Sequence, residues 1–146
     1  MSNQLQALVK YRALSLNDIN FIYASWLKSY RQSEFAKDMP NDVFFTEHKE
    51  VINTILNNPN TSVHIICNPE DVDQVYGYLV EDATHQILHF AYIKYNYRHF
   101  HLMSTLLSTL GYTSKVTPTF ITHIPRHYDI IKEKYNLVYN PYLLIP

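Results

Sequence analysis

Residues 88–110 change their hydrophobic period halfway along, and this change constrains the fold more than any other feature of the sequence. In the first part, Leu88, Phe90 and Tyr92 alternate with the residues between them, which predicts a strand with these three side chains on one face. Apolar residues then recur at three- and four-residue steps, which predicts a helix. The helical positions are Leu102, Met103, Leu106, Leu107 and Leu110.

The turn between these two elements places Arg98, His99, Phe100 and His101 at the start of the predicted helix. The first N–H groups of a helix have no partner within the helix, and they attract anions. One interpretation is therefore a site for a phosphorylated cofactor. The other is an ordinary strand–helix junction that binds nothing, and the local geometry leaves both open.

Composition limits the class of protein. A chain of 146 residues with 47% hydrophobic and 17% charged residues is typical of one globular domain, spanning 1–146. The net charge of −1 gives no general attraction to nucleic acid, and we expect no nucleic-acid partner. No apolar run is long enough for a membrane span, so we expect no membrane and a cytoplasmic location. Cys67 stands alone, which predicts a buried thiol.

Capping and turn residues place the other elements. We expect helices at 16–31, 47–57, 98–110 and 125–135, the first two capped by Ser15 and Thr46. We expect strands at 8–14, 62–67, 74–81, 88–93, 117–124 and 142–145. Gly77 inside the third strand indicates a bulge or a close approach. The order β-α-α-β-β-β-α-β-α-β predicts an α+β domain.

This order, and several stretches of sequence, resemble the GNAT superfamily of N-acetyltransferases. The segment FAYIKYNYRHFHLMSTLL is similar to the family's fourth strand, cofactor turn and third helix, and YRALSLNDINFIYASWLKSYR to its first strand and helix. QVYGYLVED is similar to the third strand. The stretch FIYASWLKSYR resembles that of a subgroup seen in bacterial and phage genomes. The resemblance implies a central mixed, mainly antiparallel sheet flanked by about four helices.

The resemblance also implies an acyl-CoA-dependent N-acyltransferase that acts on an amine-bearing small molecule or protein, with acetyl-CoA as cofactor. The family's pyrophosphate loop has two small residues, and in this chain those positions are His101 and Met103, so the loop is degenerate. The residues implied to hold the cofactor are Tyr92, Ile93, Arg98, His99, Phe100, His101, Leu102 and Met103.

The proton chemistry is assigned by the same resemblance. The family often uses a tyrosine of its fourth helix as the acid for the leaving thiolate, and by register its place falls on Lys132. Tyr128, about one turn earlier, is the candidate acid. Glu81 and His89 are the candidate bases, with the amine acceptor over the strand face that bears them.

Two other interpretations accompany this one. The pairs His99/His101 and His123/His127 are interpreted as structural histidines, because no cysteine or carboxylate cluster lies at ligand spacing, and we expect no metal.

The alternative function is a catalytically inactive GNAT-fold protein that serves as an interaction or assembly component, such as part of a phage virion, with protein partners. The thirteen tyrosines and two glycines are compatible with that alternative.

Overall fold

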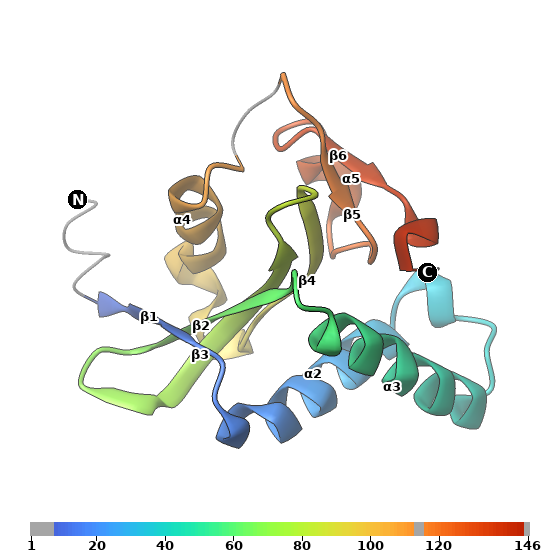
Figure 1. Ribbon diagram of the computed structural model, residues 1–146, viewed down its shortest axis with the longest axis horizontal. Helices are drawn as coiled ribbons and strands as arrows, with labels where there is room; N and C mark the ends of the chain where they lie inside the picture. The colour runs from blue at the N-terminus through green and yellow to red at the C-terminus, as the bar shows by residue number, and fades with distance from the viewer. Residues whose placement is uncertain (1–7, 113–115, 145–146) are drawn as a thin grey trace.

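The computed structural model describes residues 8–112 and 116–144 and shows a six-stranded sheet with helices on both faces (Figure 1). The strands follow one another across the sheet in chain order. They are β1 (Lys10–Ala13), β2 (Ser62–Asn68), β3 (Asp71–Asp82), β4 (Ile87–Ile93), β5 (Thr119–Ile121) and β6 (Leu137–Tyr139). The α-helices are α2 (Ile19–Arg31), α3 (Asn41–Asn57), α4 (Leu102–Thr109) and α5 (Tyr128–Ile131).

The sheet is mixed, as expected. Strands β1 to β4 pair antiparallel, whereas β4 with β5 and β5 with β6 pair parallel. Parallel pairing requires crossover connections, and α4 and α5 supply them. The α+β class is therefore confirmed, and strands and helices follow one another in the predicted order, although the last strand is at 137–139 and not at 142–145. None of the described helices combines the length and the apolarity that crossing a membrane requires.

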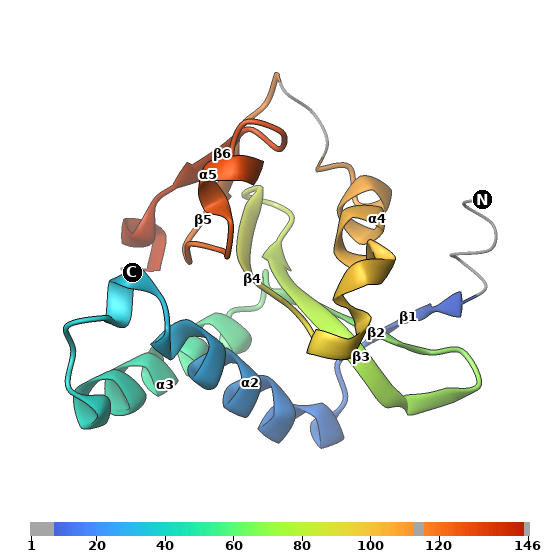
Figure 2. The ribbon, with the colours of Figure 1, turned by 180° about the vertical axis from the view of Figure 1, so that it is seen from behind.

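Helices cover the sheet in two layers (Figures 1 and 2). On one face, α2 and α3 pack through Ile22, Trp26, Phe44, Ile52 and Ile55 onto Tyr78 and Val80 of β3. On the other face, α4 packs through Leu102, Leu106 and Leu107 onto Ile66 and Leu79. The alternation of Leu79 and Val80 between the two layers follows from the period of two in a strand.

Several boundaries differ from the sequence prediction. Helix α3 begins at Asn41 and not at residue 47, and Pro40 is its N-cap residue. Proline suits a helix start, since its missing N–H would have no partner there. The predicted helix 125–135 shrinks to the four residues of α5, with His127 before it and Asn136 after it at positive φ. The predicted strand 142–145 is wrong: Pro141–Leu144 form a 3-10 turn.

Gly77 permits the close approach of β3 and β4. A Cβ atom at this position would overlap the carbonyl oxygen of Tyr92 and would lie 2.6 Å from Ile93 Cδ1. The ladder beside it is also irregular, since Ile66 pairs with Gly77 while Cys67 pairs with Val75, which leaves Tyr76 as an extra residue. Both features expected of Gly77, a close approach and a bulge, are present.

We predict that Gly77→Ala destabilises the protein by about 1–3 kcal/mol, because the new methyl group meets backbone that cannot move without breaking the β3–β4 ladder. Urea unfolding followed by circular dichroism measures the change. Gly111→Ala is the matched control: its added Cβ meets no atom within 4 Å, so its cost comes from its φ of +89° alone. Equal stability of Gly77→Ala and wild type would contradict the close approach.

Candidate functional site

A β-bulge in β4 organises the candidate site. Val80 pairs with Phe90 and Glu81 pairs with Leu88, so His89 is an extra residue opposite β3. A bulge reverses the alternation of the strand beyond it. Leu88 therefore packs with α4, whereas Phe90 and Tyr92 pack with α2 and α3. The expectation that Leu88, Phe90 and Tyr92 share one face is wrong for this reason.

Strand β4 has an open edge beyond the bulge. Within the described chain, β4 pairs with β5 only through Ile87 and Leu88, and then the two strands part. The Lys94 amide donates to the Tyr76 carbonyl of β3 at 2.8 Å. Because backbone groups alternate along a strand, the amides of Ile93 and Ala91 point to the open side. Two adjacent donors are thus available to an extended ligand.

The turn that follows β4 differs from the expected helix start. Tyr95–Phe100 form a 3-10 helix, and α4 begins only at Leu102. The predicted residues Arg98 and Phe100 lie in this turn, and Phe100 is half-exposed. His99 belongs to the same turn, and its side chain lies outside the part that the structure describes.

Arg98 turns back onto the strand. Its Nε donates to the Ile93 carbonyl at 2.8 Å, and its guanidinium lies 5.8 Å from the ring centre of Tyr92 and 5.7 Å from that of Tyr95. Arg98 therefore already bonds the carbonyl group of Ile93, the residue whose amide is one of the two that point to the open edge. A bound anion at the start of α4 would have to draw the guanidinium away from Ile93 or share it.

His101 joins the turn to α4 in the left-handed conformation, with φ of 54° and ψ of 31°. Glycine adopts this conformation without strain, and histidine is among the other residues found there. The backbone thus has the shape that a glycine would give, with an exposed imidazole added. Met103 packs into the core beneath α4, and Leu102 is buried there.

Glu81 lies near the end of β3 and is 3% exposed. Its carboxylate bonds His64 Nε2 through one oxygen and accepts the Tyr112 hydroxyl through the other. Burial opposes its ionisation, but these two hydrogen bonds outweigh burial and lower the pKa of Glu81. The carboxylate is thus ionised, enclosed and already bonded, so a substrate amine cannot reach it without rearrangement.

His89 is 7% exposed and lies in a different group of residues. Its Nδ1 is 3.0 Å from Thr122 Oγ1, and Thr122 Oγ1 is 3.0 Å from His123 Nδ1. His123 Nε2 is in turn 2.8 Å from His48 Nε2 of α3. Burial lowers the pKa of His48 and the pKa of His89 to about 4. These histidines are neutral at pH 7 and hold protons weakly.

The predicted acid and bases do not form one constellation. Glu81 bonds Tyr112 beyond the end of α4, whereas His89 connects to His123, whose ring packs on Trp26 of α2 at 5.1 Å. Their partners lie on opposite faces of the sheet, so the expectation that Glu81 and His89 share one acceptor-binding face is wrong. Tyr128 opens α5, half-buried, beside β5 and β6 (Figures 1 and 2).

The contributions of His48 and Thr122 were not predicted from the sequence. His48 lies four residues before Ile52 and seven before Ile55, on the apolar stripe of α3, and this position was the available signal. His123 was interpreted as structural, and it is 4% exposed within the core. In the described part of the chain, no group of three or more histidine, cysteine or acidic side chains is placed to hold a metal ion.

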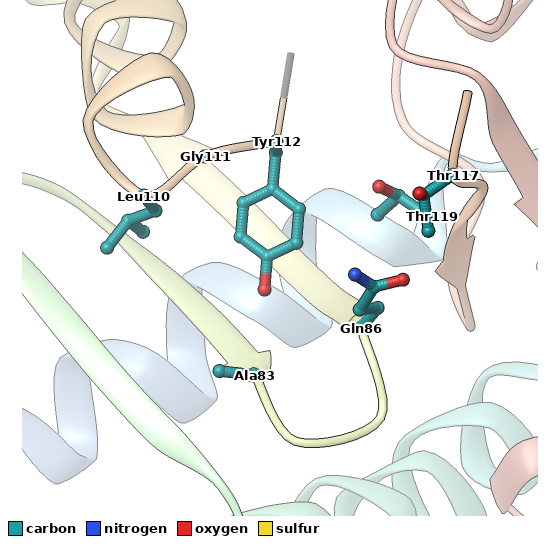
Figure 3. A pocket seen from close by; sticks show the side chains of 7 residues that line it. All are labelled: Ala83, Gln86, Leu110, Gly111, Tyr112, Thr117 and Thr119. Carbon is teal, nitrogen blue, oxygen red and sulfur yellow. The ribbon is translucent and has the colours of Figure 1, made fainter. Parts of the chain in front are cut away.

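Two hollows of the described chain lie away from the turn that follows β4. Figure 3 shows Tyr112 pointing from the end of α4 toward Ala83 and Gln86, with Thr117 and Thr119 opposite, around a cavity of about 110 Å³. An open groove of about 520 Å³ lies between the ends of β1 and β2 and includes His64. Neither hollow contains a residue of the predicted cofactor set.

No protein-family model matches this sequence, and no curated protein matches it either. Solved structures do. YjaB of Escherichia coli, in its apo form, is 16% identical over 70% of this chain and 64% of its own, with a TM-score of 0.50. The matched part is thus less than two thirds of YjaB.

Two further structures have lower TM-scores. A possible acetyltransferase from Clostridium difficile 630 is 16% identical over 90% of this chain and 76% of its own, with a TM-score of 0.47. Spermidine N-acetyltransferase from Vibrio cholerae, in complex with CoA and spermine, is 16% identical over 71% and 62%, with a TM-score of 0.44. The chain has the α+β fold of GNAT acetyltransferases, and identities this low establish the fold alone.

We predict that His101→Gly stabilises the protein by about 0.5–1 kcal/mol, because relief of the left-handed strain exceeds the extra chain entropy of glycine. His127→Gly is the matched control, since His127 has a φ of 58° and is also exposed. Urea unfolding of both variants measures the change. A loss of stability in His101→Gly alone would mean that its side chain makes a contact that the geometry does not show.

We predict that stability falls between pH 7 and pH 5. The unfolded chain takes up protons on histidine below about pH 6.5, whereas folded His48 and His89 stay neutral down to about pH 4, so stability is lost as pH falls through this window. Each contributes about 2 kcal/mol to the difference between pH 7 and pH 5.

Urea unfolding at the two pH values measures this difference. His89→Gln removes one of these groups and should reduce the pH dependence by its share. An undiminished pH dependence in His89→Gln would show that this ring is protonated in the folded protein.

Proposed function

We propose that this protein is an acyl-CoA-dependent N-acyltransferase that transfers an acyl group to an amine acceptor, in a bacterial or phage setting. The observation that carries the proposal is the open edge of β4, where the bulge at His89 leaves the amides of Ala91 and Ile93 directed away from β3. The pantetheine arm of coenzyme A carries amide groups. An arm laid along this edge would pair with the strand as an added strand does.

The turn between β4 and α4 offers part of what the phosphates of coenzyme A require. The amides at the start of α4 are available to a pyrophosphate, and Arg98 is a cation of the turn that precedes this helix. The Cβ atom and the imidazole of His101 narrow the path by which a pyrophosphate would reach these amides, and in this respect the loop is degenerate. Met103 packs inward, so its side chain does not obstruct that path. When bound, acetyl-CoA would supply the activated acyl group as a thioester.

An amine acceptor must lose a proton, and the leaving thiolate must gain one. Tyr128 is the proposed acid. Glu81 is buried and bonded to His64 and Tyr112, so it would act through one of them. His89 would have to pass a proton on, because its depressed pKa of about 4 prevents it from retaining one at neutral pH.

We predict that acetyl-CoA gives a saturable heat in isothermal titration calorimetry. Arg98→Ala should weaken binding about tenfold and reduce its dependence on salt, because a charge-assisted hydrogen bond to phosphate is lost. His101→Gly should tighten binding, because the Cβ is removed from the pyrophosphate approach. Release of free thiol in the presence of a panel of primary amines would then measure transfer.

Two controls match these variants. Lys49→Ala removes an exposed charge on α3, and His127→Gly removes a side chain from the other exposed left-handed histidine, so both should bind acetyl-CoA as wild type does. Absence of heat at millimolar acetyl-CoA would reject the proposal. Binding that Arg98→Ala and His101→Gly leave unchanged would place the cofactor elsewhere.

A second candidate function is an inactive GNAT-fold protein that serves as an assembly component, such as part of a virion. The observation that favours it is the burial and prior bonding of both predicted bases, Glu81 and His89. Absence of acetyl-CoA binding, together with sedimentation of the chain in a large particle from its native source, would support this candidate over the first.

A further inference from the structure

His64 combines a place at the surface with a bond to a buried charge. Its side chain is 28% exposed and lines the open groove of about 520 Å³ between the ends of β1 and β2. Its Nε2 bonds the carboxylate of Glu81, whose side chain is only 4% exposed. The other carboxylate oxygen accepts the Tyr112 hydroxyl. One side chain of the groove is therefore held by a carboxylate that lies in the interior.

The bond to Glu81 fixes which ring nitrogen of His64 can accept a hydrogen bond. Its two hydrogen bonds lower the pKa of Glu81 despite burial, so the carboxylate is ionised at neutral pH and can only accept. His64 Nε2 must therefore carry the proton of this bond. In a neutral imidazole the other nitrogen is then the acceptor. The lone pair of His64 Nδ1 is thus directed away from Glu81.

Two immediate neighbours of His64 on its face of the sheet are small. Ala13 of β1 pairs with His64, and Ser62 lies two residues before it in β2. Paired residues, and residues two apart in a strand, point to the same face. All three line the groove, and β1 beside them is an edge strand of the sheet (Figure 1). The groove thus has room for a ligand group next to the imidazole.

The groove also contains hydrogen-bonding groups that lack a partner. In the described part of the chain, three buried side-chain atoms have none, namely Tyr11 Oη, Thr61 Oγ1 and Trp26 Nε1. Tyr11 and Thr61 both line this groove, whereas Trp26 is a core residue of α2. A buried hydroxyl without a partner is destabilising, and an absent ligand or water is a common reason for one. These two hydroxyls therefore indicate that the groove is completed by a polar molecule.

The charges near the groove favour a cation. Asp82 follows Glu81 in β3, and its negative charge acts on Glu81. Both carboxylates have histidines, and not lysine or arginine, as their ion-pair partners in the described chain. Arg12 lines the groove, but Asp18 balances its charge through bonds of 2.7 and 2.9 Å to two guanidinium nitrogens. A negative potential is left beside the imidazole.

We propose that the groove between the ends of β1 and β2 binds a primary ammonium group, with His64 Nδ1 as its hydrogen-bond acceptor and the Glu81 carboxylate as its countercharge. An ammonium group has only donors, which matches a nitrogen that only accepts. Glu81 orients the ring, and Tyr112 orients Glu81. Strand β3 separates the groove from β4, so this site is additional to the one proposed for acyl transfer.

Butylammonium is the probe, and n-butanol is its neutral match. In nitrogen-15 spectra of histidine-labelled protein at pH 8, His64 should carry its proton on Nε2, and its Nδ1 signal should shift in a saturable way as butylammonium is added. n-Butanol should bind about tenfold more weakly or not at all, because it brings no charge to Glu81. A proton on Nδ1 alone, no saturable shift, or equal binding of n-butanol would each overturn the proposal.

Glu81→Gln removes the charge and keeps the shape of the side chain, so the dissociation constant for butylammonium should rise about tenfold. Tyr112→Phe is the matched control, because it removes the other hydrogen bond of Glu81 and keeps the charge and the bond to His64. Its dissociation constant should stay within about twofold of wild type. Binding of wild-type strength in Glu81→Gln would contradict the assigned countercharge.

His64→Phe is a second variant in case Glu81→Gln does not fold. It keeps a ring at a partly exposed position and removes Nδ1, so the backbone amide signals of 61–64 should no longer respond to butylammonium. A saturable response in this variant would place the ammonium group elsewhere and overturn the proposal. The comparison of butylammonium with n-butanol needs only wild-type protein, and no step uses acetyl-CoA. Failure of the proposed acyl transfer therefore leaves this test intact.

Discussion

The extra residue His89 in β4 is the constraint on which the rest of the structure depends. Beyond it the strand presents Phe90 to α2, where the ring stacks on Trp26 with 4.6 Å between ring centres. Without the bulge, Phe90 would point to α4 and Trp26 would lose this contact. The same reversal turns the amides of Ala91 and Ile93 to the open edge. Core packing and the candidate site are thus consequences of one irregularity.

The elements that the sequence predicted correctly are those with local signals. The stripe of α4, the strand order and the close approach at Gly77 follow from periodicity and from residue type within a few positions. The bulge at His89 has no such signal, because a bulge is defined by the pairing with Val80 and Glu81 on another strand. The tie between His48 and His123 joins residues 75 apart and required the tertiary fold.

The turn between β4 and α4 is a 3-10 helix that side chains hold in place. Tyr97 packs on Tyr76 with 4.2 Å between ring centres, and Arg98 bonds the Ile93 carbonyl, so side chains hold the 3-10 turn. This explains why the helix begins at Leu102 and not at Arg98: residues expected to open the helix are engaged with the strand. His101 then supplies the left-handed bend that glycine would supply most easily.

Cofactor binding and proton transfer make separate demands on this fold. Binding requires backbone donors at an open edge and amides at a helix start, and these survive any side-chain substitution that spares the backbone shape. Proton transfer requires a base that can reach the acceptor and retain the proton. Glu81 is ionised but enclosed, and His89 is neutral but weakly basic. A chain of this fold could therefore lose transfer and keep binding, so affinity for acetyl-CoA would test the proposed role of the β4 edge, and turnover would test the proposed base.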